Sequence, residues 1–254
     1  MIYSFGARAG IPHLTTAVPK KRYKMKIQGL EKLSMVDYDG YAACTVFLSG
    51  CNLRCPFCQN AVLLESALPE FISEDDFFAF LEKRKGLLDA VAITGGEPTL
   101  RRDLPDFCRK IKAAGYRVKL ESNGTRPDVL KKLVAEGLVD YIAMDVKCPP
   151  ADYPDLMGCD EKDLEAIKES VAFLKTAPLP YEFRTTIVDE LHDEGSIRSL
   201  GEFVKGASEL WLQKFVDRGG CLTDGLHEVP YKTAERYAEI LGAYVGRVGL
   251  RGYV

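Results

Sequence analysis

The chain has 254 residues, 46% of them hydrophobic, and carries a formal net charge of −3. It is long enough to bury a full core in one domain, and its slightly acidic balance offers no basic field that would attract nucleic acid or an anionic membrane. No stretch approaches about 18 consecutive apolar residues, and the first residues lack the pattern of a signal peptide, so we expect a soluble, cytoplasmic protein.

Residues 1–24 mix glycine, proline and a basic cluster at 20–22 without clear periodicity. Met25 stands just before the first readable pattern. Because chain termini are often poorly ordered, we expect an N-terminal extension that is mobile or precedes an alternative start. Residues 25–254 are expected to form a single domain.

The rest of the chain alternates β-branched apolar runs with segments of helical period, which is typical of repeated βα units. Six strands are predicted, at Ala43–Leu48, Ala90–Thr94, Arg117–Glu121, Tyr141–Val146, Glu182–Ile187 and Glu209–Phe215. Helices are predicted at Glu74–Lys85, Asp103–Ala114, Pro127–Glu136, Glu161–Lys175, Ser196–Gly206 and Lys232–Val245. Since about eight such units are needed to close a barrel, we predict an α/β fold with a parallel sheet, an open, partial (β/α)6 TIM barrel, whose site lies at the carboxyl ends of the strands.

The first predicted strand leads directly into Cys51, Cys55 and Cys58, which have the spacing CxxxCxxC. Thiolates are soft ligands suited to iron–sulfur clusters or zinc, but a structural zinc site needs a fourth ligand, and no nearby histidine or second CxxC supplies one. Three ligands on a four-iron cluster leave one iron open to chemistry. The scattered cysteines are expected to be buried small hydrophobic residues: Cys44, Cys108, Cys148, Cys159 and Cys221.

Polar and glycine-rich motifs follow the next strands. TGGEP begins at Thr94, and ESNG begins at Glu121. Glycines at a strand end allow a ligand to approach the backbone closely, although both motifs could also be ordinary turns. Asp145 and Lys147 lie on one face of the fourth strand, where their opposite charges need each other or a ligand. Arg184 lies in the fifth strand and could equally form a plain salt bridge.

The cysteine spacing, with Phe57 before the third cysteine, resembles the signature of radical S-adenosylmethionine (SAM) enzymes. In that superfamily the open iron of a 4Fe-4S cluster is chelated by the amino and carboxylate groups of SAM, so the resemblance implies these two cofactors. It also implies that Phe57 packs near the adenine. Gly95, Gly96 and Glu97 resemble the GGE motif, whose backbone and glutamate receive the SAM amino group.

The resemblance assigns roles to the remaining polar residues as well. Glu121, Ser122 and Asn123 would surround the SAM ribose and methionine, and a monovalent cation binds near such a segment in some activating enzymes. Asp145 and Lys147 resemble the DxK motif of glycyl radical enzyme activases, in which the lysine meets the SAM carboxylate. Arg184 resembles an arginine on the fifth strand of those enzymes.

From Lys26 to about Phe215 the chain resembles activating enzymes of glycyl radical enzymes, particularly anaerobic ribonucleoside-triphosphate reductase activating proteins. The implied reaction is reductive cleavage of SAM to a 5'-deoxyadenosyl radical, which takes a hydrogen atom from a glycine of the partner. A one-electron donor such as flavodoxin or ferredoxin and anaerobic conditions are implied too. Two departures stand out: Leu212–Phe215 lacks the histidine of pyruvate formate-lyase activase, and Asn60–Phe77 lacks cysteines for further clusters. One cluster is therefore expected.

Two other hypotheses remain open. A radical SAM enzyme acting on a small molecule or peptide would need a closed pocket rather than an open mouth. A non-catalytic module that binds zinc or a cluster would hold metal without cleaving SAM.

Overall fold

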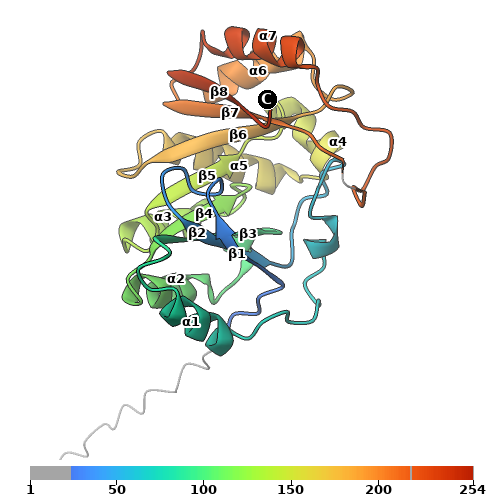
Figure 1. Ribbon diagram of the computed structural model, residues 1–254. Helices are drawn as coiled ribbons and strands as arrows, with labels where there is room; N and C mark the ends of the chain where they lie inside the picture. Colours follow the sequence, from blue (N-terminus) through green and yellow to red (C-terminus); the bar gives the residue numbers. More distant parts are fainter. Residues whose placement is uncertain (1–23, 218, 254) are drawn as a thin grey trace, which may run out of the picture.

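A computed structural model describes residues 24–217 and 219–253. Its strands form one sheet in sequence order, in which β1 is antiparallel to β2 and every later pair is parallel. The strands are β1 (Gly29–Ser34), β2 (Ala43–Leu48), β3 (Ala90–Gly95), β4 (Arg117–Ser122), β5 (Tyr141–Asp145), β6 (Tyr181–Ile187), β7 (Glu209–Lys214) and β8 (Arg247–Arg251). The sheet curves into a partial barrel with helices along its outer side (Figure 1). The α/β fold is thus confirmed, while residues 1–23 of the predicted extension (residues 1–24) lie outside the described residues.

The prediction of six strands was wrong, because the described chain has eight. β2 to β7 match the six predicted strands to within a residue or two at their ends. The two additional strands, β1 and β8, are the edges of the sheet, and most of their residues are partly exposed or fully exposed. Edge strands need no continuous apolar run, so sequence periodicity gives little signal for them.

All six predicted helices are present, and their ends shift by a few residues. The described helices are α1 (Glu74–Lys83), α2 (Leu104–Ala113), α3 (Pro127–Ala135), α4 (Tyr153–Met157), α5 (Glu161–Leu174), α6 (Glu194–Val204) and α7 (Tyr231–Leu241). α6 begins before the predicted Ser196, because Asp193 caps it: its carboxylate accepts from the Ser196 amide, and the Ser196 hydroxyl accepts from the Asp193 amide. The short α4 was not predicted. None of the described helices is long and apolar enough to cross a membrane.

Strand alternation separates an apolar outer face from a polar inner face. In β4, Val118 and Leu120 belong to the hydrophobic core, whereas Lys119 and Glu121 form ion pairs with residues of β6. Burying so many charges inside a small half-barrel is costly unless they are paired or bind a ligand. The inner face is therefore where the fold places its chemistry.

Candidate active site

A cavity of about 280 Å³ lies at the carboxyl ends of the strands. Its wall contains every site residue predicted from the sequence except Glu97: Cys51, Cys55, Phe57, Cys58, Gly95, Gly96, Glu121, Ser122, Asn123, Asp145, Lys147 and Arg184. Parallel strands that end at the same edge bring these segments together although they are up to 133 residues apart in sequence.

Backbone hydrogen bonds hold the cysteine segment from both sides. The Cys51 amide donates to Leu64 O (3.3 Å), and the Arg54 amide donates to Met157 O (2.8 Å). The Arg54 guanidinium turns back and donates to Cys51 O (2.8 Å). Burial raises the pKa of Cys51 to about 11 and also raises that of Cys55, and binding of a metal would favour their thiolate forms.

The donor set fits an iron–sulfur cluster. Three thiols line one wall, all of them free of disulfides. Within the described part of the chain, no three His, Cys, Asp or Glu side chains are arranged to hold a single metal ion. A four-iron cluster has a different requirement, since each cysteine binds its own iron and the sulfur atoms lie apart.

Gly95 and Gly96 allow the end of β3 to lie against the start of the cysteine segment. The Gly96 amide donates to Leu48 O, and the Glu97 amide donates to Gly50 O, both at 2.7 Å. A Cβ atom on Gly95 would lie 2.2 Å from Leu48 O, and one on Gly96 would lie 2.3 Å from Gly50 O. Only glycine permits this approach, so the motif fixes the position of the cysteine segment through backbone contacts.

Glu97 does not line the cavity. It is 1% exposed and accepts hydrogen bonds from the Asn123 amide (2.6 Å), the Ser122 hydroxyl (2.9 Å) and the Thr99 amide (3.0 Å). Burial raises the pKa of Glu97, and these donors oppose that shift. In the structure the Glu97 carboxylate thus positions the ESNG segment, and its role toward the SAM amino group stays a prediction.

Asn123 joins the ESNG segment to the cysteine segment. Its Nδ2 donates to Asn52 Oδ1 (3.1 Å) and lies 3.8 Å from Cys51 Sγ. An amide that points at a ligating sulfur is the kind of contact that tunes an iron–sulfur cluster.

Four charged side chains form a polar wall of the same cavity. Arg184 donates to Glu121 Oε1 (2.6 Å) and to Asp145 Oδ1 (2.9 Å), and Lys147 Nζ donates to Asp145 Oδ2 (3.1 Å). The Thr94 hydroxyl donates to Glu121 Oε2 (2.8 Å). Two carboxylates and two cations leave this wall without net charge, which suits a zwitterionic ligand.

Asp145, Lys147 and Arg184 keep one another charged. Burial alone would raise the pKa of Asp145, but Arg184 and Lys147 hold it below its ordinary value. Burial alone would lower the pKa values of Lys147 and Arg184, but their carboxylate neighbours raise both. These three groups are therefore ionised over the whole physiological pH range.

Sequence reasoning set the histidines aside as too distant, yet the structure places His192 against this wall. The Val188 amide donates to Nδ1 (3.0 Å), so Nε2 carries the proton and donates to Lys147 O (3.1 Å). Asp37, Thr186 and Gln213 line the cavity and were also missed. Strand alternation could have found Thr186, which lies two residues beyond Arg184 on the same face.

His192 should make stability sensitive to mild acid. Burial lowers its pKa, so the unfolded chain takes up a proton near pH 6.5 while the folded chain resists it. The stability that the neutral His192 contributes is fully present above pH 6.5. It is lost as the pH falls from 6.5 toward the lowered pKa of the folded state, by at most about 1.4 kcal/mol per pH unit. Urea titrations at stepped pH should show a flatter dependence for His192→Gln.

His227 provides a control of opposite sign. It is exposed, and hydrogen bonding to Glu190 raises its pKa, so it adds stability below its unfolded pKa. His227→Gln should therefore steepen the loss of stability in acid. Equal slopes for wild type and His192→Gln would contradict the assignment.

Comparison with known sequences identifies related proteins. The family model described as the radical SAM superfamily matches residues 45–197. A protein of Methanocaldococcus jannaschii, named as a candidate glycyl-radical enzyme activating enzyme, is 35% identical over 202 residues, which cover 76% of this chain and 80% of that protein. A 7-carboxy-7-deazaguanine synthase of Koribacter versatilis is 32% identical over 149 residues, covering 58% of this chain and 62% of the synthase.

Solved structures share the fold. TYW1 with a lysine-pyruvate adduct bound matches with a TM-score of 0.57 and 17% identity, over 79% of this chain and 73% of its own. Streptococcus suis SuiB bound to S-adenosylmethionine matches with a TM-score of 0.62 and 13% identity, over 82% of this chain and 52% of its own. At these identities the similarity concerns the fold alone.

Proposed function

The chain belongs to the radical SAM superfamily, and from this premise we propose that it is an activating enzyme that generates a glycyl radical on a partner enzyme. The family implies a 4Fe-4S cluster and SAM. When bound, the cluster supplies the electron that breaks a carbon–sulfur bond of SAM and yields methionine and a 5'-deoxyadenosyl radical. The observation that carries the proposal is one cavity that joins three cysteine thiols to a charge-balanced polar wall.

The residues of the cavity have distinct proposed roles. The thiolates of Cys51, Cys55 and Cys58 would hold three irons. Lys147 would meet the SAM carboxylate, because its ammonium group has donors beyond the hydrogen bond to Asp145. Phe57, which is 4% exposed and lines the cavity, would pack beside the adenine.

The remaining wall would orient SAM. Glu121, Ser122 and Asn123 line the cavity next to the thiols and would surround the ribose and methionine. Arg184 would keep Asp145 ionised and hold both Asp145 and Glu121 in place. A monovalent cation near this segment, and a flavodoxin or ferredoxin as electron donor, belong to the same proposal.

One observation favours a glycine of a protein partner as the substrate. The M. jannaschii relative carries an activating-enzyme name. We propose anaerobic ribonucleoside-triphosphate reductase as the partner. The 7-carboxy-7-deazaguanine synthase relatives keep a small-molecule substrate as the second candidate.

The test uses anaerobically reconstituted protein with dithionite and SAM. We expect 5'-deoxyadenosine by chromatography, and an organic radical in the electron paramagnetic resonance spectrum once the reductase is added. 5'-Deoxyadenosine without a radical on the reductase would reject this partner and favour the small-molecule candidate. A full, reducible cluster without SAM cleavage in the presence of the reductase would support a non-catalytic module instead.

A further inference from the structure

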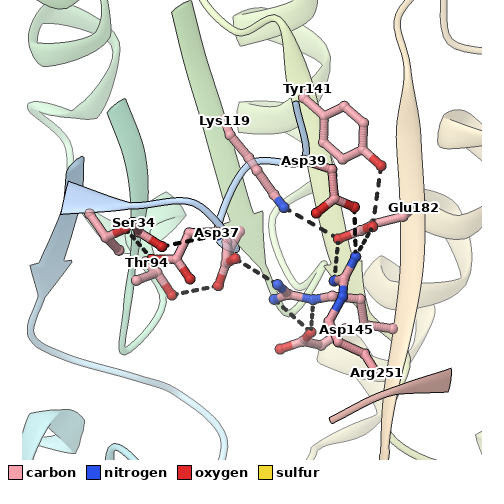
Figure 2. Close-up of polar contacts among 12 residues, drawn as sticks. Ser34, Asp37, Asp39, Thr94, Lys119, Tyr141, Asp145, Glu182 and Arg251 are labelled. Atoms are coloured by element: carbon pink, nitrogen blue, oxygen red, sulfur yellow. Dashed lines mark hydrogen bonds and ion pairs between the residues drawn. The ribbon is translucent and has the colours of Figure 1, made fainter. Parts of the chain in front are cut away.

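Side chains, not backbone hydrogen bonds, span the open side of the barrel. β1 and β8 are the two edges of the sheet, and the described strands show no ladder between them. Arg251, the last residue of β8, reaches across to Asp39 in the connection between β1 and β2, with Nη2 and Oδ2 3.1 Å apart (Figure 2). This ion pair links the first hairpin of the chain to its last strand.

The two carboxylate partners of Arg251 differ in burial. Glu182 is 1% exposed, receives the guanidinium at 3.2 Å through both terminal nitrogens, and also lies 3.4 Å from the ammonium of Lys119. The Arg251 guanidinium further lies over the ring of Trp211, at 4.4 Å from its centroid. Arg251 is thus fixed on the β8 side, because a buried bidentate pair resists separation.

The Asp39 side of the contact is weak by comparison. The Asp39 side chain is 65% exposed, so water and salt screen its attraction to Arg251. The contact can therefore open without disturbing the buried pair of Arg251 and Glu182.

The segment that Asp39 anchors also contributes to the cavity. Asp37 lines the cavity and accepts a hydrogen bond from the Thr45 hydroxyl. Met35 and Val36 are 65% and 72% exposed on the same segment. Any displacement of the segment would move a carboxylate of the cavity wall and two exposed apolar side chains together.

We infer that Arg251 is a positioning residue: through Asp39 it clasps residues 35–42 across the open side of the barrel and so holds Asp37 at the cavity. The two ion pairs of the clasp differ: the pair of Arg251 with Glu182 stays formed, whereas the pair of Arg251 with Asp39 can open. That a segment of a partner protein approaches residues 35–42 rests on the proposed function. The clasp itself does not rest on it.

Hydrogen exchange measured by mass spectrometry on the full chain tests the clasp without SAM. Asp39→Asn should speed exchange of the amides in residues 35–42 by roughly 1.5- to 5-fold at low salt, the range expected from losing one exposed ion pair. Asp39→Glu should restore slow exchange. High salt should speed exchange in the wild type and leave Asp39→Asn unchanged.

A matched variant controls for general loosening. Asp106 is 70% exposed and pairs with Arg109 on the surface, so Asp106→Asn should leave residues 35–42 unaffected. Trp211 is the only tryptophan in the chain, and its emission should stay unchanged in Asp39→Asn, because Arg251 remains in place. Salt-insensitive exchange that is equal in wild type and Asp39→Asn would overturn the clasp.

A kinetic measurement separates the clasp from the proposed function. The KM of Asp39→Asn for the reductase should rise by roughly 1.5- to 5-fold with kcat unchanged. An unchanged KM would show that the clasp does not position residues 35–42 for the approach of the reductase. If the wild type forms no radical on the reductase, the reductase is rejected as the partner. The hydrogen-exchange result still tests whether the clasp exists.

Discussion

Replacing Cys51, Cys55 or Cys58 with alanine is expected to abolish both the four-iron cluster and the formation of 5'-deoxyadenosine. Each thiolate would bind a different iron, so a single loss leaves two ligands for a cluster that already has one open iron. The carboxylates of Glu121 and Asp145 line the same cavity but do not replace the lost ligand, because they are committed to Arg184 and Lys147. Iron and sulfide content after anaerobic reconstitution, together with product chromatography, measures both effects.

Two other cysteines serve as controls. Cys108 is fully buried in α2, so Cys108→Ala should keep the cluster and cost only about 1 kcal/mol for the small cavity left behind. Cys221 is the more demanding control, because it is half-buried in a segment that packs on the cysteine loop: the Thr223 amide donates to Pro56 O at 3.1 Å. If Cys221→Ala lost the cluster, the three-ligand assignment would be wrong.

Arg184→Gln is expected to lower the free energy of unfolding by about 3–5 kcal/mol, because it leaves two carboxylates without their shared cation. Arg184 is 7% exposed and bridges Glu121 and Asp145, and the Lys147 ammonium contacts only Asp145 among them. Arg184→Lys keeps the charge but cannot bind both carboxylates through a planar fork. Its free energy of unfolding should therefore fall by less than that of Arg184→Gln. Urea denaturation at pH 7 measures the free energy of unfolding of the wild type, Arg184→Gln and Arg184→Lys.

A surface ion pair provides the matched comparison. Lys131 and Glu169 lie 2.6 Å apart with side chains 46% and 55% exposed, and Lys131→Gln should cost less than about 1 kcal/mol. If Arg184→Gln unfolded at the same urea concentration as Lys131→Gln, the charged wall would contribute no more than an exposed pair. SAM cleavage should fall in Arg184→Gln even at temperatures where the protein stays folded.

Local sequence determined much of the protein. The period of apolar residues located β2 to β7 and six helices, because buried strands and amphipathic helices leave regular patterns. The cysteine spacing together with the motifs at successive strand ends selected the cavity residues, since parallel strands deliver their carboxyl ends to one edge. Asp145 and Lys147 were expected to share a face, and they pair at 3.1 Å.

Only the tertiary structure decided contacts between residues that are far apart in the chain. The carboxylate of Glu97 found its partners in the amide of Asn123 and the hydroxyl of Ser122, which come from a different strand and its end. Folding also brought His192, 45 residues further along the chain, within hydrogen-bond distance of Lys147 O. β1 and β8 escaped prediction because edge strands lack an apolar period, and the Asp39–Arg251 contact depends on how far the sheet curves. Sequence patterns record which face of an element is buried, whereas the partner that a buried polar group finds is fixed only when the elements pack.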